Sequence, residues 1–165
     1  MEPKIITRPA FLLAGYAIKT NGEKSADECP ALWDRHNTEG WEEKLFAKLS
    51  PVRHGEYGVC AEFDRDTDGF FYLIGVEVES FDRVEPDMYK IEIPSATYAV
   101  FTTAPVGEAE FSKNIQNTWH YILSEWFPNS DYSWDETKPD FEFYDERCHG
   151  ETNKIMEIHV PVVKK

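Results

Sequence analysis

The pattern of hydrophobic and polar positions divides the first half of the chain into a strand, a broken helix and a β-hairpin. Residues 5–20 are expected to form a strand. Pro9, near its start, suits the edge or start of a strand because it cannot donate to a sheet ladder, and the residues after it are mostly apolar. A helix is expected with Pro30 in its first turn, and a second helical piece follows after a break. Two β-prone runs, 57–63 and 70–79, flank an Asp- and Gly-rich turn and predict a hairpin. The apolar side of the two helical pieces is Leu32, Trp33, His36, Trp41, Leu45 and Leu49.

The second half repeats this order. Residues 91–101 form a proline-started strand, and residues 108–127 form the clearest helix, ended by the Pro-Asn-Ser run that follows it. Two further strands are expected at residues 141–144 and 155–162, with a polar loop before the first of them. The single apolar stripe of the long helix is Phe111, Ile115, Trp119, Ile122 and Trp126.

Self-similarity at a nearly constant offset indicates an internal duplication. Pro94 corresponds to Pro9 at an offset of 85, and the last strand corresponds to residues 70–79 at an offset near 84. We therefore expect an α+β fold of duplicated β-α-β-β units with pseudo-twofold symmetry, antiparallel sheets, helices on one side and a central ligand cleft. The expected organisation is a single domain, 1–165, with repeat halves of about 1–80 and 88–165. The offset leaves open whether Glu142 corresponds to Gly58 or to Tyr57.

Charge and cysteine content narrow the choice of partners and compartment. Seventeen basic and thirty-one acidic residues give a net charge of -14, which opposes binding to nucleic acid and to anionic membranes. The three cysteines, Cys29, Cys60 and Cys148, form no CxxC pair, and the N-terminus lacks a signal-peptide pattern. We expect a cytoplasmic protein with reduced thiols. The five histidines show no ligand spacing, so no metal site is expected, and no cofactor motif is present.

Glu142 is the residue whose chemistry needs an explanation. Alternation along residues 141–144 puts Glu142 and Tyr144 on one face, opposite the phenylalanines. Either the glutamate is solvated at a strand edge, or it lies in an aromatic-lined cavity, where it takes up a proton or waits for a cation. Because aromatic faces also attract cations, the second alternative describes a receptor for flat, lipophilic cations.

Other aromatic and acidic residues have a structural and a functional interpretation. The helical stripe favours a core position for Trp119, whereas Trp33 in the broken helix is a candidate to line a cavity. Trp134, in the polar loop, is a candidate lid. Glu77 and Glu157, on the strands that close the two hairpins, either face the cavity or are solvated.

Seven segments of the chain carry a resemblance to a known family: residues 30–33, 54–59, 72–77, 93–101, 126–130, 140–145 and 156–161. Together they resemble the GyrI-like (gyrase-inhibitor-like) family, the effector-binding module of some AraC-type and multidrug-sensing regulators. The resemblance covers nearly the whole chain and implies a duplicated fold whose cleft binds small molecules around a buried glutamate matching Glu142. It also implies that Tyr57 is a cleft tyrosine and Trp33 a cleft aromatic residue. Lys154 stands where some relatives have a further cleft tyrosine. The chain begins at its first predicted strand and is acidic, so we expect no DNA-binding domain.

Three functions are compatible with this pattern. The first is a stand-alone xenobiotic-binding protein that sequesters lipophilic, cationic or planar compounds. The second, implied by the resemblance, is a hydrolase that opens the cyclopropane ring of DNA-alkylating natural products, with Glu142, Tyr57 and Tyr144 as catalytic residues. The third is inhibition of DNA gyrase by protein–protein contact. The expected ligand-binding residues are Glu142, Tyr57, Trp33, Tyr144, Trp119, Phe101 and Glu157.

Overall fold

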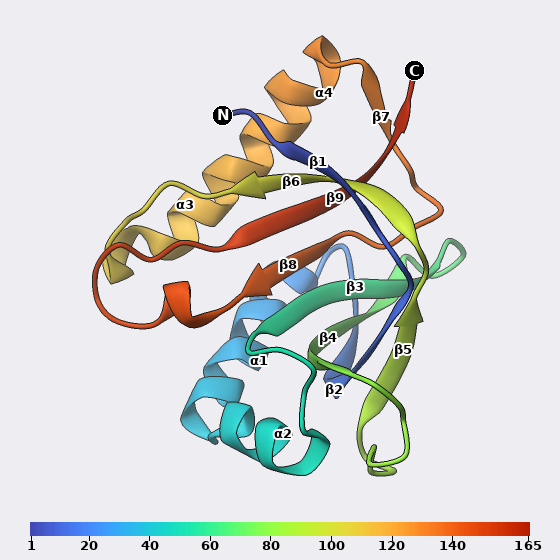
Figure 1. Ribbon diagram of the computed structural model, residues 1–165, viewed down its shortest axis with the longest axis vertical. Helices are drawn as coiled ribbons and strands as arrows, with labels where there is room; N and C mark the ends of the chain where they lie inside the picture. Colours follow the sequence, from blue (N-terminus) through green and yellow to red (C-terminus); the bar gives the residue numbers. More distant parts are fainter. The chain divides into compact units, whose positions relative to one another are not determined.

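The computed structural model describes residues 1–165, which form two compact units (Figure 1). The central unit is Phe11–Ile93, and the terminal unit combines Met1–Ala10 with Pro94–Lys165. Each unit contains an antiparallel set of strands and helices, so the predicted α+β class and the antiparallel pairing are confirmed. None of the helices is both long enough and apolar enough to cross a lipid bilayer.

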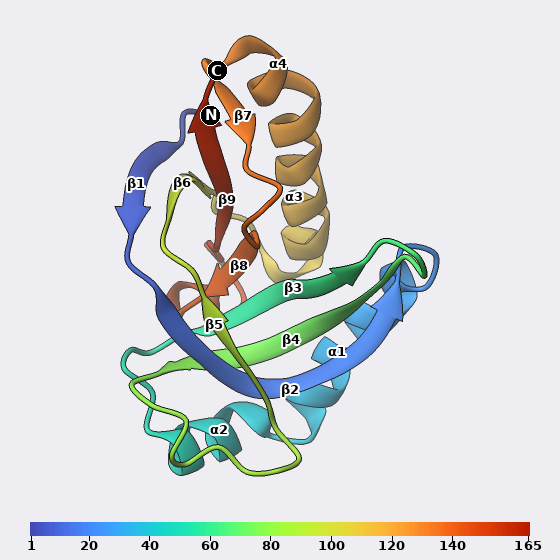
Figure 2. The same ribbon diagram turned by 90° about the vertical axis from the view of Figure 1, so that its right-hand side faces the viewer.

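The central unit pairs its strands in the order β3, β4, β2, β5. These are β2 (Phe11–Asn21), β3 (Glu56–Asp64), β4 (Gly69–Val78) and β5 (Tyr89–Ile93). Two helices, α1 (Ser25–Thr38) and α2 (Trp41–Leu49), lie on one face of these strands (Figure 2).

Apolar side chains at helical spacing attach these two helices to the sheet. Leu45 and Leu49 of α2 pack with Ala14 and Val76, and Leu32 of α1 packs with Ile74 and Tyr72. His36, predicted on the same side of α1, is 1% exposed, with Nε2 2.5 Å from Glu56 Oε1. The helical pattern in the sequence therefore identified the buried side of both helices.

The terminal unit is built around β9. β9 (Glu157–Lys164) pairs with β6 (Ala96–Thr102), β8 (Phe141–Tyr144) and β7 (Tyr132–Trp134), and β6 pairs with β1 (Lys4–Arg8). The helix α3 (Glu108–Tyr121) continues through a π-helical turn, Ile122–Trp126, into the short α4 (Phe127–Asn129), and a 3₁₀ turn, Glu146–Cys148, follows β8. The stripe of α3 packs on a core that includes Ala99, Phe101, Ile158 and Val160.

The structure differs from the expected elements in four places. Each proline-started strand is two strands, because β1 and β2 are separated at Pro9 and β5 and β6 at Pro94. The helix α1 begins at Ser25, before Pro30, and Pro30 lies inside it. The single long helix is divided by the π-helical turn. β7 lies in the stretch that was expected to be a polar loop.

Proline breaks also explain how the chain is divided into units. β1 pairs with β6 of the terminal unit, whereas β2, which follows Pro9, pairs with β4 and β5 of the central unit. The first ten residues therefore belong with residues 94–165. The repeat boundaries at about 80 and 88 remain a prediction from sequence similarity.

The strand registers resolve the one-residue ambiguity in the repeat. Ala14 on β2 lies opposite Val76 on β4, and its counterpart Ala99 on β6 lies opposite Val160 on β9. Positions on β4 and β9 therefore correspond at an offset of 84. In the same way Tyr57 lies opposite Gly75, and Phe141 opposite His159. Phe141 is therefore the counterpart of Tyr57, and Glu142 is the counterpart of Gly58.

Candidate functional site

Both oxygens of the Glu142 carboxylate accept a hydrogen bond. The indole Nε1 of Trp119 donates to Oε1 at 2.8 Å, and the hydroxyl of Tyr144 donates to Oε2 at 2.6 Å. Three of the residues that the sequence singled out are thus brought together in the terminal unit. Trp119 packs against the core on one side and donates to the glutamate with its polar edge, so it is both a core contact and a neighbour of Glu142.

The alternation of β8 produces this arrangement. Phe141 is 1% exposed and its neighbour Glu142 lies opposite Ile158, a residue of the core on which α3 packs. Glu142 and Tyr144 therefore point to the side of the strands that carries α3, where Trp119 can reach the carboxylate. The short strand and the helix stripe, both predicted from sequence, position the three side chains.

The electrostatic environment of Glu142 combines two opposing effects. Burial raises the pKa of the Glu142 carboxyl, and the hydrogen bonds from Tyr144 and Trp119 lower it. Two residues earlier, burial raises the pKa of Asp140 to about 6. The two donors supply the hydrogen bonds that the charged form of a desolvated carboxylate needs.

Aromatic rings surround the two donors. The ring of Trp134 lies parallel to that of Trp119, with centroids 6.1 Å apart, and the ring of Phe127 lies 5.6 Å from Trp134. The ring of Phe111 meets Tyr144 edge to face at 6.5 Å. Trp134, a candidate lid in the sequence, belongs to β7 and is part of this aromatic group, and Phe111 and Phe127 join it without having been singled out as site residues.

Phe101 and Glu157 lie in the same unit but outside this group. Phe101 is 0% exposed and packs edge to face with Trp126 at 5.0 Å, so it is a core residue with no surface for a ligand. Glu157 precedes Ile158 on β9 and therefore points to the opposite face from Glu142. It accepts hydrogen bonds from Arg147 Nη2 at 2.9 Å and pairs with His159 Nε2 at 3.0 Å, and these partners lower its pKa to about 2.

In the central unit, Tyr57 is fully buried. It is 0% exposed, and its hydroxyl donates to Glu77 Oε2 at 2.8 Å. Arg53 Nε lies 3.0 Å from the same oxygen, so Glu77 is an ion-paired carboxylate rather than a solvated one. In this conformation Tyr57 offers no surface to a ligand, and its counterpart Phe141 is buried in the same way.

Trp33 binds a tyrosine where Trp119 binds a carboxylate. The indole Nε1 of Trp33 donates to the hydroxyl of Tyr72 at 2.8 Å, and its ring meets His36 edge to face at 5.4 Å. Because Gly58 is the counterpart of Glu142, the central unit has no carboxylate at that position. The two units therefore differ at this position, where the terminal unit has a carboxylate and the central unit a glycine.

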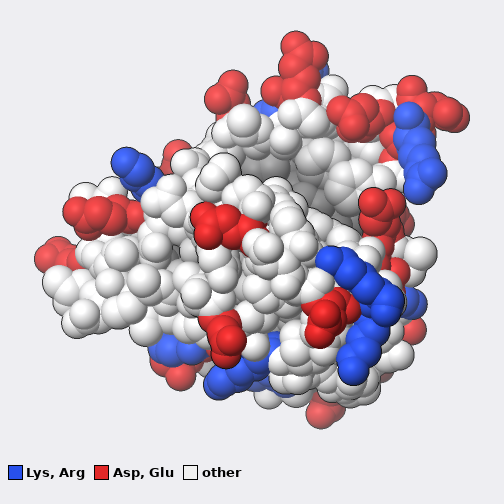
Figure 3. All heavy atoms as spheres, turned by 90° about the horizontal axis from the view of Figure 1, so that it is seen from above, with Lys and Arg blue, Asp and Glu red and all other residues white.

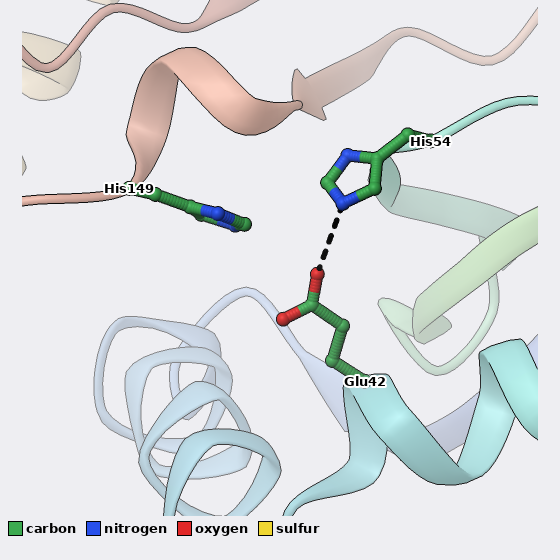
Figure 4. A group of neighbouring side chains, drawn as sticks. All are labelled: Glu42, His54 and His149. Carbon is green, nitrogen blue, oxygen red and sulfur yellow. Dashed lines mark ion pairs between the residues drawn. The ribbon is translucent and has the colours of Figure 1, made fainter.

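The central unit also contains a hollow and an exposed ion pair. The hollow has a volume of about 370 Å³ and is lined by residues of β2, α1 and α2, Tyr16, Leu32, Arg35 and Trp41 among them. His54 Nε2 lies 3.8 Å from Glu42 Oε1 (Figure 4). On the face in Figure 3, acidic side chains are spread around uncharged surface and basic side chains lie among them, as expected from the net charge of -14.

Comparison with known families and curated proteins gives a consistent result. Residues 1–163 match the family described as GyrI-like small molecule binding domain. The transcriptional regulator BrlR of Pseudomonas aeruginosa is 28% identical over 98% of this chain, and the chain spans 56% of the length of BrlR. YobU of Bacillus subtilis is 26% identical over 92% of this chain and 91% of its own length.

Solved structures show the same fold. A protein from Staphylococcus aureus is 22% identical with a TM-score of 0.76, and 98% of each chain is covered. SAV2435, solved with tetraphenylphosphonium bound, is also 22% identical, with a TM-score of 0.78 over 99% of this chain and 94% of that one.

Proposed function

The chain belongs to the GyrI-like small-molecule binding domain family, and from this premise we propose that it binds lipophilic, cationic or planar compounds at Glu142. One observation carries the proposal. A glutamate whose pKa is raised by burial is held by two hydrogen-bond donors and surrounded by aromatic side chains. A desolvated carboxylate of this kind gains most from a cation that also contacts aromatic faces.

One solved structure with the same fold supports this choice of ligand. SAV2435, which has the same fold, was solved with tetraphenylphosphonium, a large lipophilic cation. We extend this ligand class to the present chain because Glu142, Trp119 and Tyr144 provide a negative charge beside large apolar rings. Sequestration of such compounds needs no cofactor, so binding alone is the proposed activity.

Tetraphenylphosphonium titrated into the wild-type protein and into Glu142→Gln, followed by calorimetry, tests the proposal. The substitution keeps the size of the side chain and removes its charge, and we expect affinity to fall by about tenfold or more, which corresponds to about 1.4 kcal/mol. Glu136→Gln, in the loop after β7, is the matched control because it removes one acidic charge from an exposed position. Equal affinities of the wild type and Glu142→Gln would exclude Glu142 as the binding carboxylate.

A further inference from the structure

The hydrogen bonds at Glu142 limit what the carboxylate can offer to a ligand. Trp119 occupies one acceptor position of Oε1, and Tyr144 occupies one of Oε2. A carboxylate has about four lone-pair sites in all, so at most about two remain for any further donor. These hydrogen bonds do not neutralise the charge of the ionised carboxylate, but they use part of its acceptor capacity.

The aromatic rings around the two donors supply no further acceptors. The indole of Trp134 is a donor only, and the rings of Phe111 and Phe127 have no polar atom. Their faces nevertheless attract positive charge through the ring quadrupole. The environment therefore favours a cation by its charge and its apolar surface rather than by directional hydrogen bonds.

Two kinds of cation respond differently to such an environment. A primary ammonium ion has three N–H donors, and each of them that loses its water without gaining an acceptor weakens binding by about tenfold. A quaternary ammonium or phosphonium ion has no donor and gives up no hydrogen bond when it is desolvated. The difference in affinity between the two kinds of cation therefore depends on how many hydrogen-bond acceptors the protein leaves free for the ligand.

We propose that the Glu142 site selects permanently charged onium ions over primary ammonium ions of the same size, and that Trp119 and Tyr144 determine this selectivity. This inference rests on the proposed function, because it assumes that a cation binds at Glu142. Trp119 and Tyr144 act here as positioning residues, since each fixes one carboxylate oxygen and takes up part of its acceptor capacity.

An isomeric pair of probes tests the selectivity without changing the protein. One probe is trimethyl(pyrenylmethyl)ammonium, and the other is its isomer in which the methyl groups are on carbon and the nitrogen bears three hydrogens. Both carry one positive charge at neutral pH and have the same number of apolar atoms. Fluorescence titration of the wild-type protein should show tighter binding of the trimethylammonium probe by about tenfold or more, the ratio given by one unmatched donor.

Two variants test the role of the donors. Trp119→Phe frees one position on Oε1, and Tyr144→Phe frees one on Oε2, so in each the preference between the isomers should fall at least about threefold, because a reopened acceptor can satisfy one N–H. Trp126→Phe and Tyr132→Phe are matched controls in the same unit, and they should keep the wild-type ratio. Circular dichroism confirms the fold of each variant, and the ratio of two affinities is insensitive to a general loss of binding.

The possible results distinguish a failure of the proposed selectivity from a failure of the proposed binding function. If the wild-type protein binds the isomers equally, or prefers the primary ammonium, while Glu142→Gln weakens both, the selectivity is wrong and the binding proposal stands. If Glu142→Gln affects neither probe, or neither binds, the proposed function itself is wrong. An unchanged ratio in both Trp119→Phe and Tyr144→Phe would show that these two donors do not determine the preference.

Discussion

The indole nitrogen of Trp33 lies 2.8 Å from the hydroxyl oxygen of Tyr72, the same distance at which Trp119 meets the carboxylate of Glu142. Each unit thus places a helical tryptophan against a polar group of its own strands. In the terminal unit this polar group is the carboxylate of Glu142, whereas Gly58 occupies the equivalent position in the central unit. The two units thus use a tryptophan donor with different acceptors.

The hydrogen bond between Tyr57 and Glu77 is expected to stabilise the fold rather than to contact a ligand. Tyr57→Phe should lower the free energy of unfolding by about 1–3 kcal/mol, because it removes a hydrogen bond to a buried charge. Urea unfolding followed by fluorescence measures this change.

A surface tyrosine provides the control for Tyr57. Tyr121 donates to the backbone oxygen of Met1 at 2.8 Å in an exposed setting, so Tyr121→Phe should change stability by no more than about 0.5 kcal/mol. An equal loss in both variants would mean that the burial of Glu77 does not matter.

Asp140 gives the protein a predictable pH response. Burial raises the pKa of its carboxyl from the ordinary value of 3.8 to about 6, so between these values the folded state binds more protons than the unfolded state. The contribution of Asp140 to stability should therefore increase as the pH falls from 7 to 5. In Asp140→Asn this increase should be absent, a difference of about 1 kcal/mol between pH 7 and pH 5.

Urea unfolding of the wild type and Asp140→Asn at pH 7 and pH 5 checks this response. Glu157 titrates in the opposite sense, because its pKa is lowered to about 2, and the stability that it contributes is lost only as the pH falls below about 4.5 towards 2. The window from pH 7 to 5 therefore separates the two groups. Parallel pH profiles for wild type and Asp140→Asn would contradict the assignment.

The burial of Phe101 distinguishes a core residue from a ligand contact. Phe101→Ala should destabilise the fold by about 3–5 kcal/mol, because it opens a cavity beside Trp126 and removes buried apolar surface. Phe101→Leu, a smaller change, should keep tetraphenylphosphonium affinity within about twofold while lowering stability by roughly 1 kcal/mol. Thermal unfolding and calorimetry on the same samples measure both quantities, and a loss of affinity in Phe101→Leu without a loss of stability would return Phe101 to the ligand site.

The sequence by itself determined the duplication, the α+β class and the face of each amphipathic element. These depend on periodicity, which is local, so Leu45 and Leu49 on α2 and Phe141 on β8 are buried as their spacing predicts. It also identified Glu142 as the chemically unusual residue, because a carboxylate between phenylalanines is visible without coordinates.

Only the tertiary structure decided which residues meet. Glu142 and Gly58 occupy equivalent positions in the repeat, and this follows from which residues lie opposite one another in the strands. A register shifted by one residue would place Glu142 on the other face. Contacts between residues distant in sequence bring Trp119 to Glu142, form the ion pair of Glu77 and place Phe101 in the core. Such contacts are fixed by packing in three dimensions, which no local pattern specifies.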